Sequence, residues 1–94
     1  MYYIYILYSP TSDKYYVGYT TDPYRRVLEH NTKTFNTYTS KYRPWILAMA
    51  FACSYEEKEA IRIERFIKKQ KSSIFINKII EFEQVRQSLI LKFK

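Results

Sequence analysis

The chain has 94 residues, which is enough for one compact domain and too few for two, so we expect a single domain over residues 1–94. Hydrophobic residues make up 47% of the chain, which is sufficient for a core and argues against disorder. Sixteen Lys and Arg against nine Asp and Glu give a formal net charge of +7, which favours polyanionic partners such as nucleic acid. The single cysteine, Cys53, excludes an internal disulfide and a cysteine-based zinc site.

The segment Met1–Leu7 is apolar, but it is short and no positive charge precedes it. We therefore expect no signal peptide, and no later stretch is long enough to cross a bilayer. These features predict a cytoplasmic protein.

Alternating side chains predict a β-hairpin in the first part of the chain. Residues Tyr2–Tyr8 alternate between two faces, one of which carries Tyr5 and the other Ile4. Turn-forming residues occupy positions 9–13, and the alternating pattern resumes over Tyr15–Tyr19. The two strands are therefore expected to pair antiparallel.

A helix and a third strand are expected next. Asp22 is a typical N-cap residue and Pro23 a typical first-turn residue, so a helix should begin there and run to about His30. Residues 31–44 are polar and predicted to be irregular. The apolar run Trp45–Cys53 is short enough to be a strand.

Two more helices complete the predicted order. Ser54 and Glu57 have the spacing of a capping box, so a helix should follow and run to about Gln70. A last helix is predicted from about Ser73 to Leu91. The predicted fold is α+β: a small three-stranded antiparallel sheet flanked by helices, in the order β-β-α-β-α-α. The apolar residues at helical spacing in the first of these helices are Ala60, Ile63, Phe66 and Ile67.

The hairpin carries the first group of candidate functional residues. Tyr5 and Tyr16 should be opposite or diagonal neighbours across it, with both side chains on one face. Gly18 is the only glycine and lies in mid-strand, where glycine is unfavourable. A bulge and a close approach of a ligand to the backbone would each explain this glycine.

The first predicted helix carries the second group. Arg26 and His30 are four residues apart and share a face, while Tyr24, Val27 and Leu28 supply the apolar face. An arginine can hold a phosphate and stabilise charge in a transition state. His30, the only histidine, is the one imidazole available for acid–base chemistry. A solvated arginine and an incidental histidine stay open as alternatives.

The second long helix carries Glu64 at the edge of its apolar stripe. A carboxylate in that place can hold Mg²⁺, which takes one or two carboxylates and keeps several waters. An i,i+4 salt bridge with Lys68 is the alternative.

In combination, these residues resemble the motifs of the GIY-YIG nuclease superfamily over about residues 2–71. Tyr3-Ile4-Tyr5 is similar to the first motif and Tyr16-Val17-Gly18 to the second. The residues that follow in the order and spacing of the superfamily are Arg26, His30 and Glu64.

Other segments resemble a narrower group of small single-domain bacterial proteins, UPF0213, and similar segments open some structure-specific nucleases. Tyr3 departs from the wider pattern, because many members have glycine there. Many members also have an asparagine after the glutamate helix, and Asn77 could be that residue. The segments shared with the narrower group are Tyr3-Ile4-Tyr5-Ile6-Leu7, Tyr38-Thr39, Arg43-Pro44-Trp45 and Glu64 followed by Ile67-Lys68-Lys69.

The resemblance implies a Mg²⁺-dependent DNA endonuclease, with Mn²⁺ as an alternative ion, acting in DNA repair or processing. Glu64 would hold the metal, and Tyr5 or Tyr16 would orient the attacking water and take its proton. Arg26 would clamp the phosphate, and His30 would hydrogen-bond a catalytic tyrosine or the phosphate. The implied substrate is DNA, including branched or nicked DNA, cut with structure selectivity or weak specificity. A protein partner that supplies target selection is also implied.

Basic residues are expected to position the DNA through its phosphates. Tyr38 and Trp45 could stack on an unpaired base, or they could pack within the fold. The residues expected to contact DNA are Gly18, Arg25, Lys41, Arg43, Arg62, Arg65, Lys68, Lys69 and Lys71.

Two other classes of function stay open on the sequence. The first is a nucleic-acid-binding module that cleaves little without a partner protein. The second is an interaction protein whose apolar C-terminal stretch, residues 74–91, forms a dimer face. The alternative for that stretch is that it covers the sheet.

Overall fold

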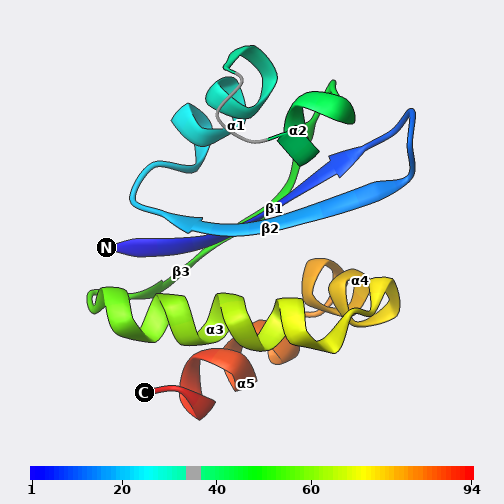
Figure 1. The fold of residues 1–94 in the computed structure, drawn as a ribbon. Coiled ribbons are helices and arrows are strands. Elements are labelled where there is room, and N and C mark those ends of the chain that lie inside the picture. The colour runs from blue at the N-terminus through cyan, green and yellow to red at the C-terminus, as the bar shows by residue number, and fades with distance from the viewer. Residues whose placement is uncertain (34–36) are drawn as a thin grey trace.

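A three-stranded antiparallel sheet lies between two groups of helices in the computed structural model, which describes residues 1–33 and 37–94 (Figure 1). The strands are β1 (Tyr2–Ser9), β2 (Lys14–Thr20) and β3 (Ile46–Ser54), and their order across the sheet is β2-β1-β3. β1 pairs antiparallel with both neighbours. The expected hairpin, third strand and α+β class are therefore confirmed.

The register of the hairpin decides which side chains meet. Tyr5 is paired with Gly18, and Leu7 is paired with Tyr16. Tyr5 and Tyr16 are therefore diagonal neighbours on one face of the sheet, as expected. The pairing of β1 with β2 is continuous from Tyr3 to Ser9, so a bulge does not explain Gly18.

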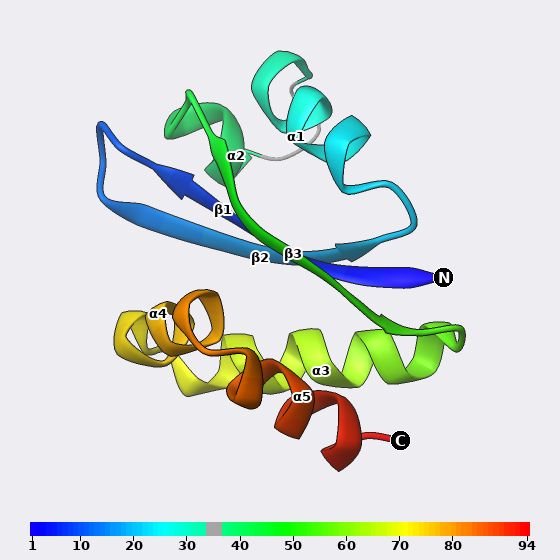
Figure 2. The same ribbon diagram turned by 180° about the vertical axis from the view of Figure 1, so that it is seen from behind.

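The helix α3 (Glu57–Gln70) covers one face of the sheet (Figures 1 and 2). Its apolar stripe packs against the face that carries Ile4 and Ile6. The helices α4 (Ser73–Glu81) and α5 (Glu83–Lys92) lie on the same side, and α5 also contacts β3. The C-terminal stretch therefore helps to close this core. The buried residues of α3 are Ala60, Ile63 and Ile67, with Phe66 partly buried beside them.

The opposite face of the sheet is covered by α1 (Pro23–Thr32) and α2 (Thr37–Lys41). The predicted start of α1 is confirmed, because Asp22 accepts a hydrogen bond from the backbone N–H of Arg25. The buried residues on this face form a small cluster of Tyr5, Leu7 and Trp45.

The prediction that residues 31–44 are irregular is partly wrong. α1 continues to Thr32, and α2 is a helix, while residues 34–36 lie outside the described part of the chain. The indole N–H of Trp45 donates a hydrogen bond of 2.7 Å to the carbonyl of Thr39, which is buried. This tertiary contact stabilises α2, although the polar local sequence does not predict a helix there.

The predicted single C-terminal helix is also wrong, since α4 and α5 are separated at Phe82, whose backbone is extended (φ −115°, ψ 116°). Arg86 donates hydrogen bonds of 2.7 and 3.0 Å to the carbonyls of Ile79 and Ile80, which lie near the end of α4. These bonds give donors to carbonyls in the last turn of α4, which would lack partners where the helix ends. The observed order is therefore β-β-α-α-β-α-α-α.

The capping box expected before α3 is not formed. The N-cap residue is Glu56, and its side chain makes no capping hydrogen bond. Ser54 instead accepts a hydrogen bond from the N–H of Glu56 and donates one to the carboxylate of Glu59.

Among the described residues, none of the helices has the length and the apolar character needed to span a membrane.

Candidate active site

Gly18 admits the ring of Tyr5 into the site. A Cβ atom built on Gly18 would lie 2.4 Å from both Cζ and Oη of Tyr5, so any larger residue would displace this ring. Gly18 is itself buried. The ring of Tyr5 therefore explains the mid-strand glycine, because it occupies the space above Gly18 that a ligand would otherwise take.

Tyr5 and His30 form a buried hydrogen-bonded pair. Tyr5 Oη and His30 Nε2 are 2.9 Å apart, and both residues are almost completely buried. Burial lowers the pKa of His30 to about 4, with further lowering by the positive charges of Arg26 and Arg43. His30 is therefore neutral near pH 7, and its place in the structure is that of a hydrogen-bonding partner for a tyrosine.

Tyr5 is only 1% exposed, and this burial raises its pKa to about 12. A hydrogen bond and the positive charge from Arg26 lower the pKa, whereas Tyr16 and Glu64 raise it. The hydroxyl of Tyr5 therefore stays protonated at neutral pH. The groups that act on the pKa of Tyr5 therefore come from α1, β2 and α3.

Arg26 lies between Tyr5 and an acidic neighbour on its own helix. Its Nη1 is 2.9 Å from a carboxylate oxygen of Glu29, and its side chain also hydrogen-bonds Tyr5. The guanidinium is thus oriented from two sides and partly buried. Such an orientation favours the binding of an anion such as a phosphate oxygen.

The apolar face expected for α1 is only partly correct. Val27 packs against the cluster of Tyr5, Leu7 and Trp45. Tyr24 and Leu28 are 80% and 62% exposed, because α1 turns Pro23 and His30 toward the sheet instead.

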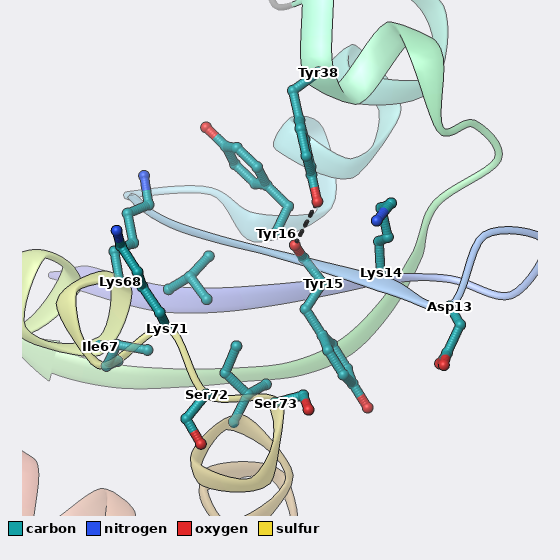
Figure 3. Close-up of a pocket in the computed structure, with 12 residues that line it drawn as sticks. Asp13, Lys14, Tyr15, Tyr16, Tyr38, Ile67, Lys68, Lys71, Ser72 and Ser73 are labelled. Atoms are coloured by element: carbon teal, nitrogen blue, oxygen red, sulfur yellow. Dashed lines mark hydrogen bonds between the residues drawn. The ribbon is translucent and has the colours of Figure 1, made fainter.

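Tyr16 is the partly exposed tyrosine of the site. Its ring centroid is 4.8 Å from that of His30 and 6.3 Å from that of Tyr5. It also lines a cleft of about 620 Å³, shown in Figure 3, and the ammonium group of Lys68 lies 5.1 Å from its ring centroid. A substrate in the cleft would therefore reach Tyr16 and not the buried Tyr5.

Glu64 is paired with Lys68, as the salt-bridge alternative predicted. The two charged atoms are 3.3 Å apart, and the Glu64 side chain is 17% exposed. No group of three or more His, Cys, Asp and Glu side chains that could hold a metal ion occurs within residues 1–33 and 37–94. A lone carboxylate nevertheless suits Mg²⁺, which accepts one or two carboxylates and completes its shell with water and substrate phosphates.

Arg43, expected to contact DNA, and Trp45, considered for stacking on a base, both have structural partners. Arg43 donates a hydrogen bond of 2.7 Å from Nε to the carbonyl of His30, and it also hydrogen-bonds the carbonyl of Lys33. Arg43 thus holds the end of α1. Trp45 is buried, so it packs within the fold and the stacking alternative is wrong for it.

The remaining basic residues expected to contact DNA are exposed, but they are not gathered in one place. Lys68 and Lys71 line the cleft, whereas Arg62, Arg65 and Lys69 do not. Arg25 and Lys41 belong to the helices on the other face of the sheet.

Sequence reasoning missed several residues of the cleft. Lys14 and Tyr15 follow the hairpin turn, and Ser72 and Ser73 precede the body of α4. No spacing pattern brings these segments together, so only the packing of α4 beside β2 reveals them. Asn77, also on α4, accepts a hydrogen bond of 2.6 Å from the hydroxyl of Tyr15.

The fold and the site define a small basic α+β domain with a cluster of Tyr, Arg, His and Glu side chains at the edge of its sheet. The family model of the GIY-YIG catalytic domain matches residues 1–79, so this chain belongs to the GIY-YIG family, a family of nucleases. Searches of curated proteins and of solved structures gave no match.

Proposed function

We propose that this chain is a Mg²⁺-dependent DNA endonuclease that hydrolyses phosphodiester bonds. One observation carries the proposal. Side chains from four separate elements are linked through Tyr5: its hydroxyl is paired with His30 and Arg26, Tyr16 lies beside the His30 ring, and Glu64 acts electrostatically on Tyr5. A cluster of this kind combines groups for binding a phosphate, for moving a proton and for holding a cation.

Tyr16 is the better candidate for the group that orients the attacking water and accepts its proton. It lines the open cleft, whereas Tyr5 is buried and keeps its proton at neutral pH. Tyr5 would act as a positioning residue, since its ring fills the space above Gly18 and its hydroxyl meets His30.

Arg26 would bind a non-bridging oxygen of the scissile phosphate and stabilise the charge that develops during hydrolysis. Glu64 would hold Mg²⁺, or Mn²⁺ in its place, and the ion would supply charge neutralisation at the phosphate and at the leaving oxygen. Lys68, which neutralises Glu64 at 3.3 Å, lies where it can pair with a phosphate instead.

The substrate would be DNA, because a charge of +7 in 94 residues favours a polyanion and the chain belongs to a nuclease family. A domain of this size offers little contact area, so we expect structure selectivity or weak sequence specificity. A role in DNA repair or processing, a cytoplasmic location, a protein partner for target selection and membership of UPF0213 stay predictions of the sequence.

The test compares wild type with Glu64→Ala on labelled duplex, nicked, branched and single-stranded DNA, in Mg²⁺, Mn²⁺ or EDTA. The matched control is Glu81→Ala, which removes an exposed carboxylate from the end of α4. We expect cleavage by wild type and by the control, none by Glu64→Ala, and none in EDTA. Equal cleavage by wild type and Glu64→Ala would refute the role of Glu64.

A second candidate is a nucleic-acid-binding module that needs a partner to cleave. The ion pair of Glu64 with Lys68 favours it, because this pair leaves the carboxylate already neutralised. DNA binding that survives EDTA, without cleavage in any metal, would support this candidate over the nuclease.

A further inference from the structure

Most residues that line the cleft beside the candidate active site are not among the candidate catalytic residues. It lies between β2, α2 and the junction of α3 with α4, and Figure 3 shows side chains from these elements around one space. Tyr16 belongs both to the cleft and to the candidate catalytic residues, and Lys68 lines the cleft and is paired with Glu64 at 3.3 Å. A molecule bound in the cleft would therefore lie next to Glu64.

The lining combines aromatic rings with positive charge. Asp13 is the one acidic residue in the described lining, and its carboxylate accepts a hydrogen bond of 2.8 Å from the hydroxyl of Tyr8. The floor is apolar, with Val17, Ile67 and Ile76. Aromatic faces over an apolar floor suit a nucleobase, and ammonium groups suit a phosphate. The aromatic and basic lining residues are Tyr15, Tyr16, Tyr38, Lys14, Lys68 and Lys71.

The size of the cleft limits what can enter. Its volume of about 620 Å³ lies within the range of pockets that enclose one small ligand, roughly 300–1,000 Å³. One nucleotide fits that space, whereas a base-paired duplex does not.

Tyr38 is held in place as one wall of the cleft. Its hydroxyl donates a hydrogen bond of 3.3 Å to the backbone carbonyl of Tyr15, drawn as the dashed line in Figure 3. Its ring stacks on the buried Trp45 at a centroid distance of 6.0 Å, and the residue is still 39% exposed. A ring fixed in this way loses little conformational entropy when a base stacks on it.

We propose that this cleft binds one unpaired nucleotide next to the scissile phosphate, with its base on Tyr38 and its phosphate between Lys68 and Lys71. The inference rests on the proposed function and specifies the substrate class: DNA in which a duplex adjoins an unpaired nucleotide. A blunt, fully paired duplex leaves the cleft empty and binds more weakly.

The test uses a duplex that ends in a short single-stranded overhang, with 2-aminopurine at the first unpaired position. This adenine analogue loses fluorescence when it stacks, and EDTA keeps the strand intact during the measurement. We expect wild type to quench the fluorescence and to bind this DNA about tenfold more tightly than a blunt duplex of the same length. Tyr38→Ala should abolish both effects, and Tyr38→Phe, which keeps the ring, should retain them.

A charge variant guards against the case in which Tyr38→Ala disturbs the fold. Lys71 and Lys58 are both exposed lysines, but only Lys71 lines the cleft. Lys71→Ala should weaken binding of the overhang DNA more than binding of the blunt duplex, and Lys58→Ala should not discriminate between them.

The cleft proposal and the nuclease proposal fail in different ways. Equal binding of overhang and blunt DNA by wild type, without quenching, overturns the cleft proposal even if cleavage depends on Glu64. Unchanged quenching by Tyr38→Ala overturns it as well. A protein that never cleaves but shows the expected quenching in EDTA retains the nucleotide site and loses only the nuclease.

Discussion

Gly18→Ala should destabilise the protein, although alanine is normally the better residue within a strand. Replacing a strand glycine by itself should gain about 0.5–1 kcal/mol. Here the new Cβ would lie 2.4 Å from two atoms of the Tyr5 ring, which is enclosed by the cluster that contains Leu7 and Trp45. Forcing the ring aside costs about 1–3 kcal/mol as overpacking and about 1–3 kcal/mol for separating the buried Tyr5–His30 pair.

The net expectation is a loss of about 1–5 kcal/mol in the free energy of unfolding, measured by urea denaturation. A double-mutant cycle identifies the cause: in a Tyr5→Leu background the clash is relieved, so Gly18→Ala should cost much less there. Lys14→Ala, at the exposed start of β2, serves as the control and should change stability little. Wild-type stability in Gly18→Ala, or strictly additive effects in the cycle, would refute the steric explanation.

Two further predictions concern the ionisable residues of the site. The pKa of His30 falls from 6.5 to about 4 on folding, so below pH 6.5 the unfolded chain binds a proton that the folded chain does not. The free energy of unfolding should be highest above pH 6.5 and decrease as the pH falls toward 4, by about 1–2 kcal/mol between pH 7 and 5. Urea denaturation of wild type and His30→Gln at these two pH values measures the contribution of the histidine. Equal pH dependence in the two proteins would mean that His30 is solvated. Lys68→Ala should lower the free energy of unfolding by less than about 1 kcal/mol, because the ion pair of Lys68 with Glu64 is partly exposed. The same change should reduce the slope of the logarithm of the DNA-binding constant against the logarithm of salt concentration by about the amount that one phosphate contact contributes. An unchanged slope of binding against salt concentration would place Lys68 away from the DNA.

The features that follow from local spacing could be predicted from the sequence. Strict alternation placed Ile4 on one face and Tyr5 on the other, and the structure confirms this division. The short hairpin then requires Tyr5 and Tyr16 to be neighbours, because the turn fixes the register. The Asp22 cap and the stripe of α3 are likewise local patterns.

Features that depend on contacts between distant segments could not be predicted. The helix α2 depends on the hydrogen bond from Trp45 to Thr39, and nothing in its own polar sequence indicates it. The orientation of α1 exposes Tyr24, because the buried His30 is hydrogen-bonded to Tyr5 across the fold. Helical periodicity counts histidine as polar and tyrosine as apolar, so it places His30 and Tyr24 on the wrong faces of α1.

The cleft belongs to the same category. It forms where α4 comes beside β2, and the hydrogen bond from Tyr15 to Asn77 joins residues that lie far apart in the chain. Nothing in the sequence indicates that Lys68 of α3 and Lys71, the residue that ends this helix, line the cleft while Lys69 does not.

One side of the helix α3 packs against the sheet, and a second side carries residues of the candidate site. Ile63 and Ile67 are buried against the sheet, while Glu64 and Lys68, each the next residue along, face the site at the edge of β2. A change of volume at either isoleucine would tilt or slide the helix and move the carboxylate relative to Tyr16 on the far side of the strand. Selection for the proposed reaction would therefore restrict Ile63, which lies outside the cleft, as well as Ile67, which lines it. The two isoleucines should vary less among related proteins than the exposed Arg62 and Lys69 of the same helix.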